Sequence, residues 1–370
     1  MQIWLMDMAC PPSGFQDILV SAGRAAPSVQ VRSLTDQMDT TFPAGPLLLA
    51  PPATQRLGGA VAAALGTALS TVELRPFGRG DFKIRPLGPV RGRDVYLLHG
   101  LYGDPQGSAC DRLCELLFLA GAVGDAGAAR VSALIPYLAF ARKDRRTKAR
   151  DPVTSRYVAQ MIESVGIGHV MAVEVHNPAA FDNAFRIPAD HLTTTRLFAD
   201  HFAARFRTRR LAVVSPDLGG AKRAQLLREA LQRRCDTPVE FGCVEKRRSA
   251  GVVSGHYFAG DVSGCSVILL DDLISSGETL LRAAQACRAA GATEVHAAAA
   301  HAPLAPAAAG RLNEPTLDSL TVTDTVPLDS QAAGQLGNRV TVLPIAGLLA
   351  DAIACQRGDG SLSTLLELDG

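Results

Sequence analysis

Short apolar runs alternate with helical patterns along most of this 370-residue chain. Runs rich in Val, Ile and Leu are typical of strands that are buried on both faces of a parallel sheet. Between them, segments such as 54–65 and 220–232 carry apolar residues at helical spacing. The strands that we expect are 47–50, 70–74, 94–99, 131–135, 169–175, 211–215, 239–243, 267–270 and 294–299.

This alternation predicts an α/β fold with two similar, doubly wound parallel-sheet domains. The length allows this, because domains usually have about 100 to 200 residues. We expect an N-terminal domain over 1–190, in which 1–44 form an extension without an assigned role, and a C-terminal domain over 191–338. The boundary is expected near Pro188 to Thr195. The segment 339–370, helical at 348–355, is expected to pack on the N-terminal domain.

Composition narrows the class of protein. The net charge of +1 gives no reason to expect a nucleic-acid binder. Eight cysteines stand singly, and Cys110 and Cys114 are four residues apart on an expected helix, a pattern that favours reduced thiols in the cytoplasm. No apolar run reaches about 18 residues and the first residues lack a basic region, so we expect neither membrane insertion nor secretion.

The most informative stretch is 267–280, where an apolar strand runs into adjacent carboxylates and then a hydroxylated turn. Carboxylates accept hydrogen bonds from vicinal ribose hydroxyls, while hydroxyls and backbone N–H groups at a helix start hold phosphate. Ligands of open α/β sheets bind at this edge. An ordinary turn with two solvated aspartates is the alternative. The candidate sugar-phosphate residues are Asp271, Asp272, Ser275, Ser276, Gly277 and Thr279.

This stretch resembles the phosphoribosyl pyrophosphate loop that type I phosphoribosyltransferases share with phosphoribosyl pyrophosphate synthetases. Further stretches are similar to the synthetases in order and spacing, over roughly residues 46–366, whereas a transferase would share only the loop. The resemblance implies two domains of the type I phosphoribosyltransferase-like fold. The further stretches are 91–96, 136–152, 174–177, 214–223 and 245–248.

The reaction that this resemblance implies moves the β,γ-diphosphoryl group of ATP to the 1-hydroxyl of ribose 5-phosphate and releases AMP. Such chemistry depends on positioning and charge neutralisation, with Mg²⁺ as the expected metal. By resemblance, Lys246, Arg248 and His176 are catalytic, Asp217, Gly219 and Gly220 form a diphosphate loop, and Glu174, His176 and Asp217 are metal ligands. The implied ATP-binding residues are Phe77, Arg79, Asp81, Arg142, Lys143 and His176.

Some of these residues also have ordinary structural interpretations. Arg142 suits bidentate phosphate recognition but could lie in a solvated turn, and His176 could be a core histidine. Asp217 could be a helix N-cap, which is compatible with a diphosphate role. Phe77 could stack on adenine or pack in the core. The resemblance also implies that the hairpin around Phe77 reaches a neighbouring subunit's ATP, and hence a homo-oligomer with shared sites.

Several residues depart from the pattern of the family, which suggests a divergent subgroup. A carboxylate about 5 Å from a phosphate dianion would be repelled by roughly 6 kcal/mol at a dielectric near 20. In an active enzyme, Glu278 must therefore point away from the phosphate, toward solvent or a cation such as Arg282. The departures stand at Arg79, Lys143, Thr147, Glu174, Ser275 and Glu278.

Two other functions stay open on the sequence. One is a regulatory paralogue that assembles with a true synthetase, against which the intact Lys246, Arg248, His176 and Asp271-Asp272 argue. The other is a phosphoribosyltransferase, against which the 245–248 segment and the second α/β domain argue.

Overall fold

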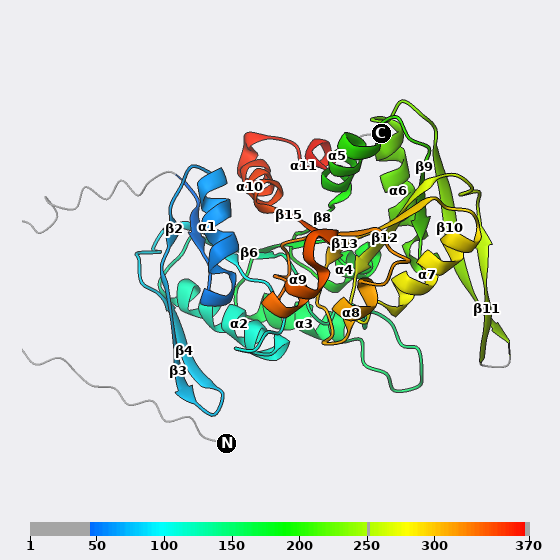
Figure 1. Cartoon of the computed structure of the whole chain (residues 1–370). Coiled ribbons are helices and arrows are strands. Elements are labelled where there is room, and N and C mark those ends of the chain that lie inside the picture. Colours follow the sequence, from blue (N-terminus) through cyan, green and yellow to red (C-terminus); the bar gives the residue numbers. More distant parts are fainter. Residues whose placement is uncertain (1–44, 250–251, 367–370) are drawn as a thin grey trace, which may run out of the picture. The chain divides into compact units, whose positions relative to one another are not determined.

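A computed structural model describes the backbone of residues 45–249 and 252–366 (Figure 1). The expectation of an extension over residues 1–44 lies outside this range. The described residues belong to one compact unit and form two main sheets and a separate hairpin. Among them, no helix is both long and apolar enough to cross a membrane.

The first sheet is entirely parallel, with the strand order β2-β1-β5-β6-β7-β8. Its four inner strands are apolar runs that the sequence predicts, and most of their side chains are buried. The edge strands β2 and β8 are mostly only partly buried, and β8 was not expected. The strands are β1 (Leu47–Leu49), β2 (Leu69–Ser70), β5 (Asp94–Leu98), β6 (Arg130–Ile135), β7 (His169–Val173) and β8 (Ala189–Leu192).

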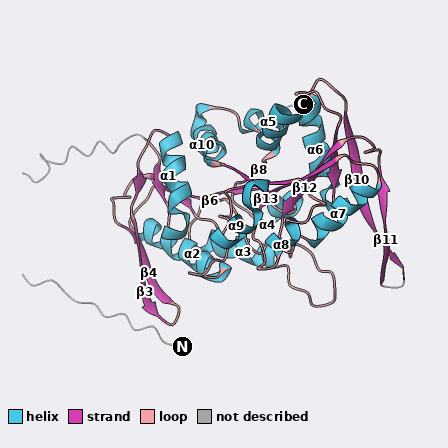
Figure 2. Ribbon diagram, in the orientation of Figure 1, coloured by secondary structure: helices cyan, strands magenta, loops and turns pink. Residues whose placement is uncertain are grey.

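Helices pack on both faces of this sheet because successive strand residues point to opposite sides. In β5, Val95 and Leu97 pack with α2, α3 and α4, whereas Tyr96 and Leu98 pack with α1 and α10. Figure 2 shows these helices on the two sides of the strands. Their bounds are α1 (Gln55–Ala64), α2 (Ala109–Asp125), α3 (Thr154–Ser164), α4 (Pro178–Ala184) and α10 (Ala346–Ala354).

The second sheet has the order β11-β10-β9-β12-β13-β14-β15, and only the β10–β11 pair is antiparallel among its described strands. The expected strand 239–243 is longer in the structure and forms a ribbon with β11. The strands are β9 (Leu211–Ser215), β10 (Val239–Ser249), β11 (Val252–Ala259), β12 (Ser266–Leu273), β13 (Glu294–His301), β14 (Ser319–Thr323) and β15 (Val340–Leu343).

This sheet is also covered on both faces. Helices α5 and α6 pack on one face around Val213 and Ile268, and α7, α8 and α9 pack on the other around Val214 and Leu269. The two sheets thus repeat one architecture, as the sequence predicts. The helices are α5 (Thr195–Phe206), α6 (Ala221–Gln232), α7 (Glu278–Ala289), α8 (Ala308–Leu312) and α9 (Ser330–Leu336).

The last part of the chain divides between the two sheets. Strand β15 is the edge strand of the second sheet, whereas Ile345 and α10 belong to the core of the first. The segment that packs on the first sheet therefore begins at Ile345 and not at residue 339. Strand β8 extends the first sheet to Leu192. The chain therefore passes to the second sheet after residue 192, whereas the expected N-terminal domain ended at residue 190.

The expected strand 70–74 is in fact two elements. Leu69–Ser70 forms β2, and the following residues form the hairpin of β3 (Val72–Gly78) and β4 (Asp81–Pro86). The hairpin turns at Arg79, which has a positive φ of 53°, between two glycines that also have positive φ. This local geometry ends one strand and starts the next within two residues.

Candidate functional site

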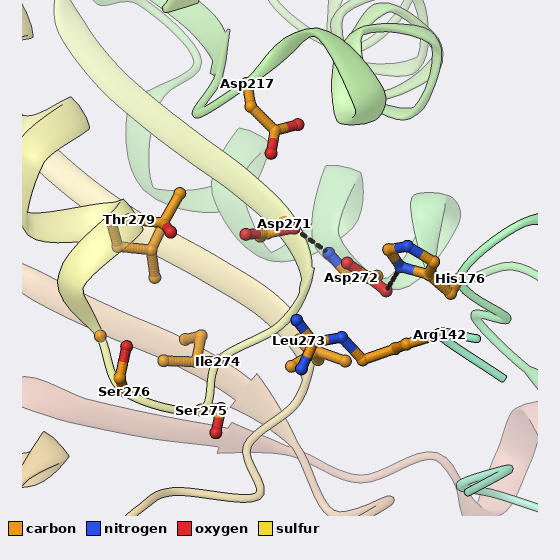
Figure 3. A pocket seen from close by; sticks show the side chains of 12 residues that line it. Arg142, His176, Asp217, Asp271, Asp272, Leu273, Ile274, Ser275, Ser276 and Thr279 are labelled. Atoms are coloured by element: carbon orange, nitrogen blue, oxygen red, sulfur yellow. Dashed lines mark hydrogen bonds and ion pairs between the residues drawn. The ribbon is translucent and has the colours of Figure 1, made fainter. Parts of the chain in front are cut away.

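A cavity of about 210 Å³ lies at the carboxyl end of β12, where the sequence predicts the sugar-phosphate site (Figure 3). Every residue of the stretch 271–277 lines it, and Thr279 joins them from the first turn of α7. Arg142 and His176 also line it, although they belong to the other half of the chain. The structure therefore brings together residues that stand about a hundred positions apart in the sequence.

The loop between β12 and α7 is held from outside the cavity. Ser275 O accepts a hydrogen bond from Ala305 N at 3.0 Å, and Ser276 O accepts one from Arg311 at 3.1 Å. Both carbonyl groups are thus engaged by residues that do not line the cavity. Gly277 has a φ of +77°, and a Cβ there would meet the Leu312 side chain at 3.1 Å. Glycine is therefore required for the turn into α7.

Glu278 points away from the cavity, as charge repulsion with a bound phosphate requires of an active enzyme. It begins α7, its side chain is 57% exposed, and it does not line the cavity. Its cationic neighbour is Arg311, at 3.9 Å, and not the expected Arg282. Arg311 comes from α8, which packs against α7, so it could not be identified by helical spacing alone.

Adjacent carboxylates on β12 have opposite protonation tendencies. Burial and the neighbouring Asp272 raise the pKa of Asp271 to about 8. Burial also disfavours the charged form of Asp272, but the hydrogen bond from His176 and the charge of Arg223 outweigh it and lower the pKa of that carboxyl. The pair is thus set to carry one proton near neutral pH, with the negative charge on Asp272.

His176 reaches Asp272 across the two halves of the chain. It follows β7, and its Nδ1 lies 2.7 Å from Asp272 Oδ2 at the end of β12, so this hydrogen bond joins the two sheets. The hydrogen bond to Asp272 raises the pKa of His176. His176 is exposed, so the alternative of a core histidine is wrong.

Glu174, an expected metal ligand, is buried with its carboxylate already bonded. Oε1 accepts from Thr194 N at 2.6 Å and from Thr194 Oγ1 at 2.9 Å, and Oε2 accepts from Arg223 Nε at 3.2 Å. The Arg223 guanidinium also lies 3.9 Å from Asp272. This arrangement favours a structural anchor over a metal ligand. Arg223 was not among the site residues expected from the sequence, although it ends the run 214–223 that carries the resemblance.

The candidate diphosphate loop follows β9. Asp217 Oδ1 accepts from Gly220 N at 3.1 Å, so Asp217 is an N-cap, and Ser215 Oγ donates to Asp217 O at 2.6 Å. A Cβ on Gly220 would lie 2.8 Å from Ser215 Oγ. The short helix Leu218–Gly220 then leads into α6. The N-cap interpretation holds, and Asp217 still lines the cavity.

A larger cavity of about 1120 Å³ adjoins the first. Gly219, Gly220 and Lys222 line it on one side, and Lys143 and Asn177 on the other. The Lys143 ammonium lies 2.6 Å from Asp151 and 3.2 Å from Thr147 Oγ1, so it also ties its own loop together. Residues lining both cavities are Arg142, His176, Asp217, Asp271 and Asp272.

The expected ATP-binding residues of the hairpin are not brought to these cavities. Phe77, Arg79 and Asp81 lie on the β3–β4 hairpin, and none of the described residues that line the two cavities comes from it. Phe77 is 62% exposed, so it is not a core residue. Lys246 and Arg248 belong to strand β10, which pairs with β11 in an extended ribbon. Their side chains lie outside the described part of the structure.

Comparisons with known proteins give one family. Residues 47–166 match the N-terminal domain of ribose phosphate pyrophosphokinase, and 253–367 match the phosphoribosyl synthetase-associated domain. A ribose-phosphate pyrophosphokinase of Pasteurella multocida is 33% identical over 85% of this chain and 96% of its own. The Chromobacterium violaceum enzyme of that name is 36% identical over 81% of this chain and 88% of its own.

A solved structure agrees with these sequences. The phosphoribosylpyrophosphate synthetase of Mycobacterium smegmatis superposes with a TM-score of 0.76 and 29% identity, over 85% of this chain and all of that one. The likeness thus extends over most of the chain. This chain belongs to the ribose-phosphate pyrophosphokinase family.

Proposed function

We propose that this protein is an active ribose-phosphate pyrophosphokinase, which transfers the β,γ-diphosphoryl group of ATP to the 1-hydroxyl of ribose 5-phosphate. One observation carries the proposal most directly. A single cavity joins the hydroxylated loop and carboxylate pair of β12 to Arg142 and His176 from the other half. Residues that suit ribose 5-phosphate and residues that suit ATP therefore line the same cavity.

The acceptor fits the smaller cavity. Ser275, Ser276 and Thr279 offer hydroxyls beside the N-terminus of α7, where the helix dipole favours an anion. Asp271 and Asp272 lie at the other end of this loop and can accept hydrogen bonds from the ribose 2- and 3-hydroxyls. Because Glu278 faces Arg311, its charge does not oppose the phosphate.

The donor fits the larger cavity, with its phosphates directed toward the smaller one. Arg142 lines both spaces and would bind the triphosphate at their junction. Gly219 and Gly220 allow the backbone to approach a diphosphate closely. We further propose that Lys246 and Arg248 neutralise charge on the group in transfer, which is the usual role of cations in phosphoryl transfer.

Mg²⁺ is the metal that we propose. Within the described residues, no group of three His, Cys, Asp or Glu side chains is arranged as a metal site. Asp217 lines both cavities, and Mg²⁺ commonly takes one or two carboxylates together with substrate phosphates and waters. Asp217 would hold the metal beside the ATP phosphates, where its positive charge would offset theirs. We do not propose Glu174 as a metal ligand, because its carboxylate oxygens already accept hydrogen bonds from Thr194 and Arg223.

We also propose that the protein forms a homo-oligomer in which the hairpin completes a neighbour's ATP site. The exposed Phe77 ring, with the Arg75 guanidinium 5.8 Å from its centre, offers a flat surface for adenine. The proposal includes a cytoplasmic location, which the free thiols of Cys110 and Cys114 support.

Measuring product formation separates this function from its alternatives. The purified chain is incubated with ATP, Mg²⁺ and ribose 5-phosphate, and AMP is measured with and without the sugar phosphate. We expect AMP only when both substrates are present. A regulatory paralogue would give no AMP unless a second chain were added. A phosphoribosyltransferase would instead consume phosphoribosyl pyrophosphate when a nucleobase is supplied, and that result would contradict the proposal.

A further inference from the structure

His301 is a fully enclosed histidine at the end of β13 whose ring reaches the first sheet. Its Nε2 lies 3.1 Å from Val173 O and 3.2 Å from Glu174 O, at the end of β7. Carbonyl oxygens only accept, so Nε2 carries the proton and donates to both. Burial lowers the pKa of His301, which keeps the ring neutral, and Nδ1 accepts from Thr325 Oγ1 at 2.8 Å.

The backbone that His301 contacts has an unusual conformation. Glu174 has a φ of +41°, which is rare for a residue with a side chain and persists only where the surroundings impose it. Its carboxylate is held by Thr194 and Arg223. His301 holds the carbonyl of the same residue. Contacts from both halves of the chain therefore impose this turn.

The turn at Glu174 determines where His176 lies. Strand β7 ends at Val173, and the chain changes direction at Glu174 before it reaches His176, whose Nδ1 bonds to Asp272 at 2.7 Å. Without the N–H group of His301, the carbonyl oxygens of Val173 and Glu174 would lose the hydrogen bonds that they accept from it. The turn could then relax toward an ordinary φ, and His176 would move relative to the carboxylate pair.

We propose that His301 is a positioning residue, which fixes the turn at Glu174 and thereby holds His176 against Asp272. The inference rests on the proposed function in so far as His176 serves the reaction. A purely structural role would explain the burial of His301. It would not explain why the ring spans the two sheets and bonds to the one described residue of β7 and its exit that has a positive φ.

The chain offers a matched control on the same strand. His296 is also fully buried in β13, with Nδ1 2.8 Å from Ser319 Oγ and Nε2 3.4 Å from Glu294. Its ring packs 4.8 Å from that of Phe206. These partners all belong to the second half of the chain. Replacing His296 should therefore cost stability without moving His176.

The experiment compares His301→Leu, His301→Gln and His296→Leu with the wild type. We expect His301→Leu to lower kcat at least tenfold, because small misplacements of reacting groups cost up to about 10² in rate, with KM changing less. His301→Gln retains an N–H donor and should recover to within about threefold of the wild type. His296→Leu should lower the melting temperature but leave kcat within about twofold.

A second measurement does not need turnover. The proton on His176 Nδ1, shared with Asp272, can be followed by NMR of histidine-labelled protein. We expect its signal in the wild type and in His296→Leu, and its loss in folded His301→Leu. Absence of AMP from the wild type would end the proposed function but leave this comparison intact. An unchanged signal and kcat in His301→Leu, or equal losses in His296→Leu, would overturn the inference.

Discussion

His176 Nδ1 lies 2.7 Å from Asp272 Oδ2, which links the exit of a strand in the first sheet to the end of a strand in the second. In the function that we propose, this hydrogen bond joins a residue on the ATP side of the site to one on the ribose 5-phosphate side. It also keeps Asp272 ionised, while burial leaves Asp271 protonated near neutral pH. The carboxylate pair is therefore asymmetric before any substrate binds.

Replacing Asp272 with Asn should weaken the acceptor selectively. A hydrogen bond to a charged group contributes about 1.5 to 3 kcal/mol, so we expect the Kd for ribose 5-phosphate to rise roughly tenfold to a hundredfold. The Kd for ATP with Mg²⁺, measured by calorimetry, should stay within about threefold. Asp318→Asn, which alters a carboxylate paired with Arg288 outside both cavities, is the control. Equal losses for both ligands in Asp272→Asn would assign the pair to the metal or the fold.

Asp271 should make stability fall as pH rises. The pKa of Asp271 is about 8 in the folded protein, against an ordinary value of 3.8. Between these two pH values the folded state keeps a proton that the unfolded state has lost, so folding becomes less favourable as the pH rises. Asp271→Asn lacks this proton. The melting temperature of the variant minus that of the wild type, measured without substrates, should therefore increase by a few degrees from pH 5 to pH 8. A difference that is constant with pH would show that Asp271 ionises normally.

Lys246→Ala should affect the rate more than binding. If Lys246 stabilises charge that develops during transfer, kcat should fall by roughly 10² or more, which is about 3 kcal/mol, with modest change in either KM. Steady-state kinetics and a melting curve of the variant test this together. A kcat equal to that of the wild type would remove the β10–β11 ribbon from the mechanism.

Glu278→Gly should be nearly neutral for the acceptor. The carboxylate is exposed and its contact with Arg311 is 3.9 Å long, and such solvated pairs contribute only about 0.3 to 0.5 kcal/mol. We expect the KM for ribose 5-phosphate to change by less than about tenfold. Glu278→Gln, which keeps the length of the side chain, is the control. An improvement or a loss of a hundredfold in Glu278→Gly would mean that the carboxylate faces the phosphate in the working enzyme.

Glu174 and Asp217 should respond differently to metal. Asp217→Asn removes a negatively charged carboxylate from the lining of the cavities. It should raise the Mg²⁺ concentration for half-maximal activity by about tenfold. Glu174→Gln removes the negative charge that pairs with the guanidinium of Arg223 in a buried position. The free energy of unfolding of this variant should therefore fall by about 3 kcal/mol or more. Its Mg²⁺ requirement should stay within about threefold. A reversed pattern would restore Glu174 as the metal ligand.

The sequence alone was enough to predict the parts of the fold that are determined by residues close together in the chain. The strand 267–270 and the loop after it were recognisable because buried parallel strands are continuous apolar runs and the hydroxylated turn has few other uses. The orientation of Glu278 followed from Coulomb repulsion alone. Its partner did not, because Arg311 reaches it from another helix.

Long-range contacts account for what the sequence could not predict. The resemblance implies that Glu174 is a metal ligand, but Thr194 and Arg223, from other parts of the chain, already donate hydrogen bonds to its carboxylate. His301 gave no signal of its own, because its role depends on a carbonyl in the other sheet. Pairing with β11 likewise turns the polar segment after Cys243 into a strand.

The fate of both transferred phosphorus atoms tests the central claim most directly. ³¹P NMR can follow the reaction of ATP, Mg²⁺ and ribose 5-phosphate until the sugar phosphate is consumed. We predict one AMP for each phosphoribosyl pyrophosphate formed, with the β and γ phosphorus atoms of ATP both appearing in the diphosphate on C1. Formation of ADP with a single phosphoryl group on the sugar, or of AMP with free diphosphate, would contradict the account.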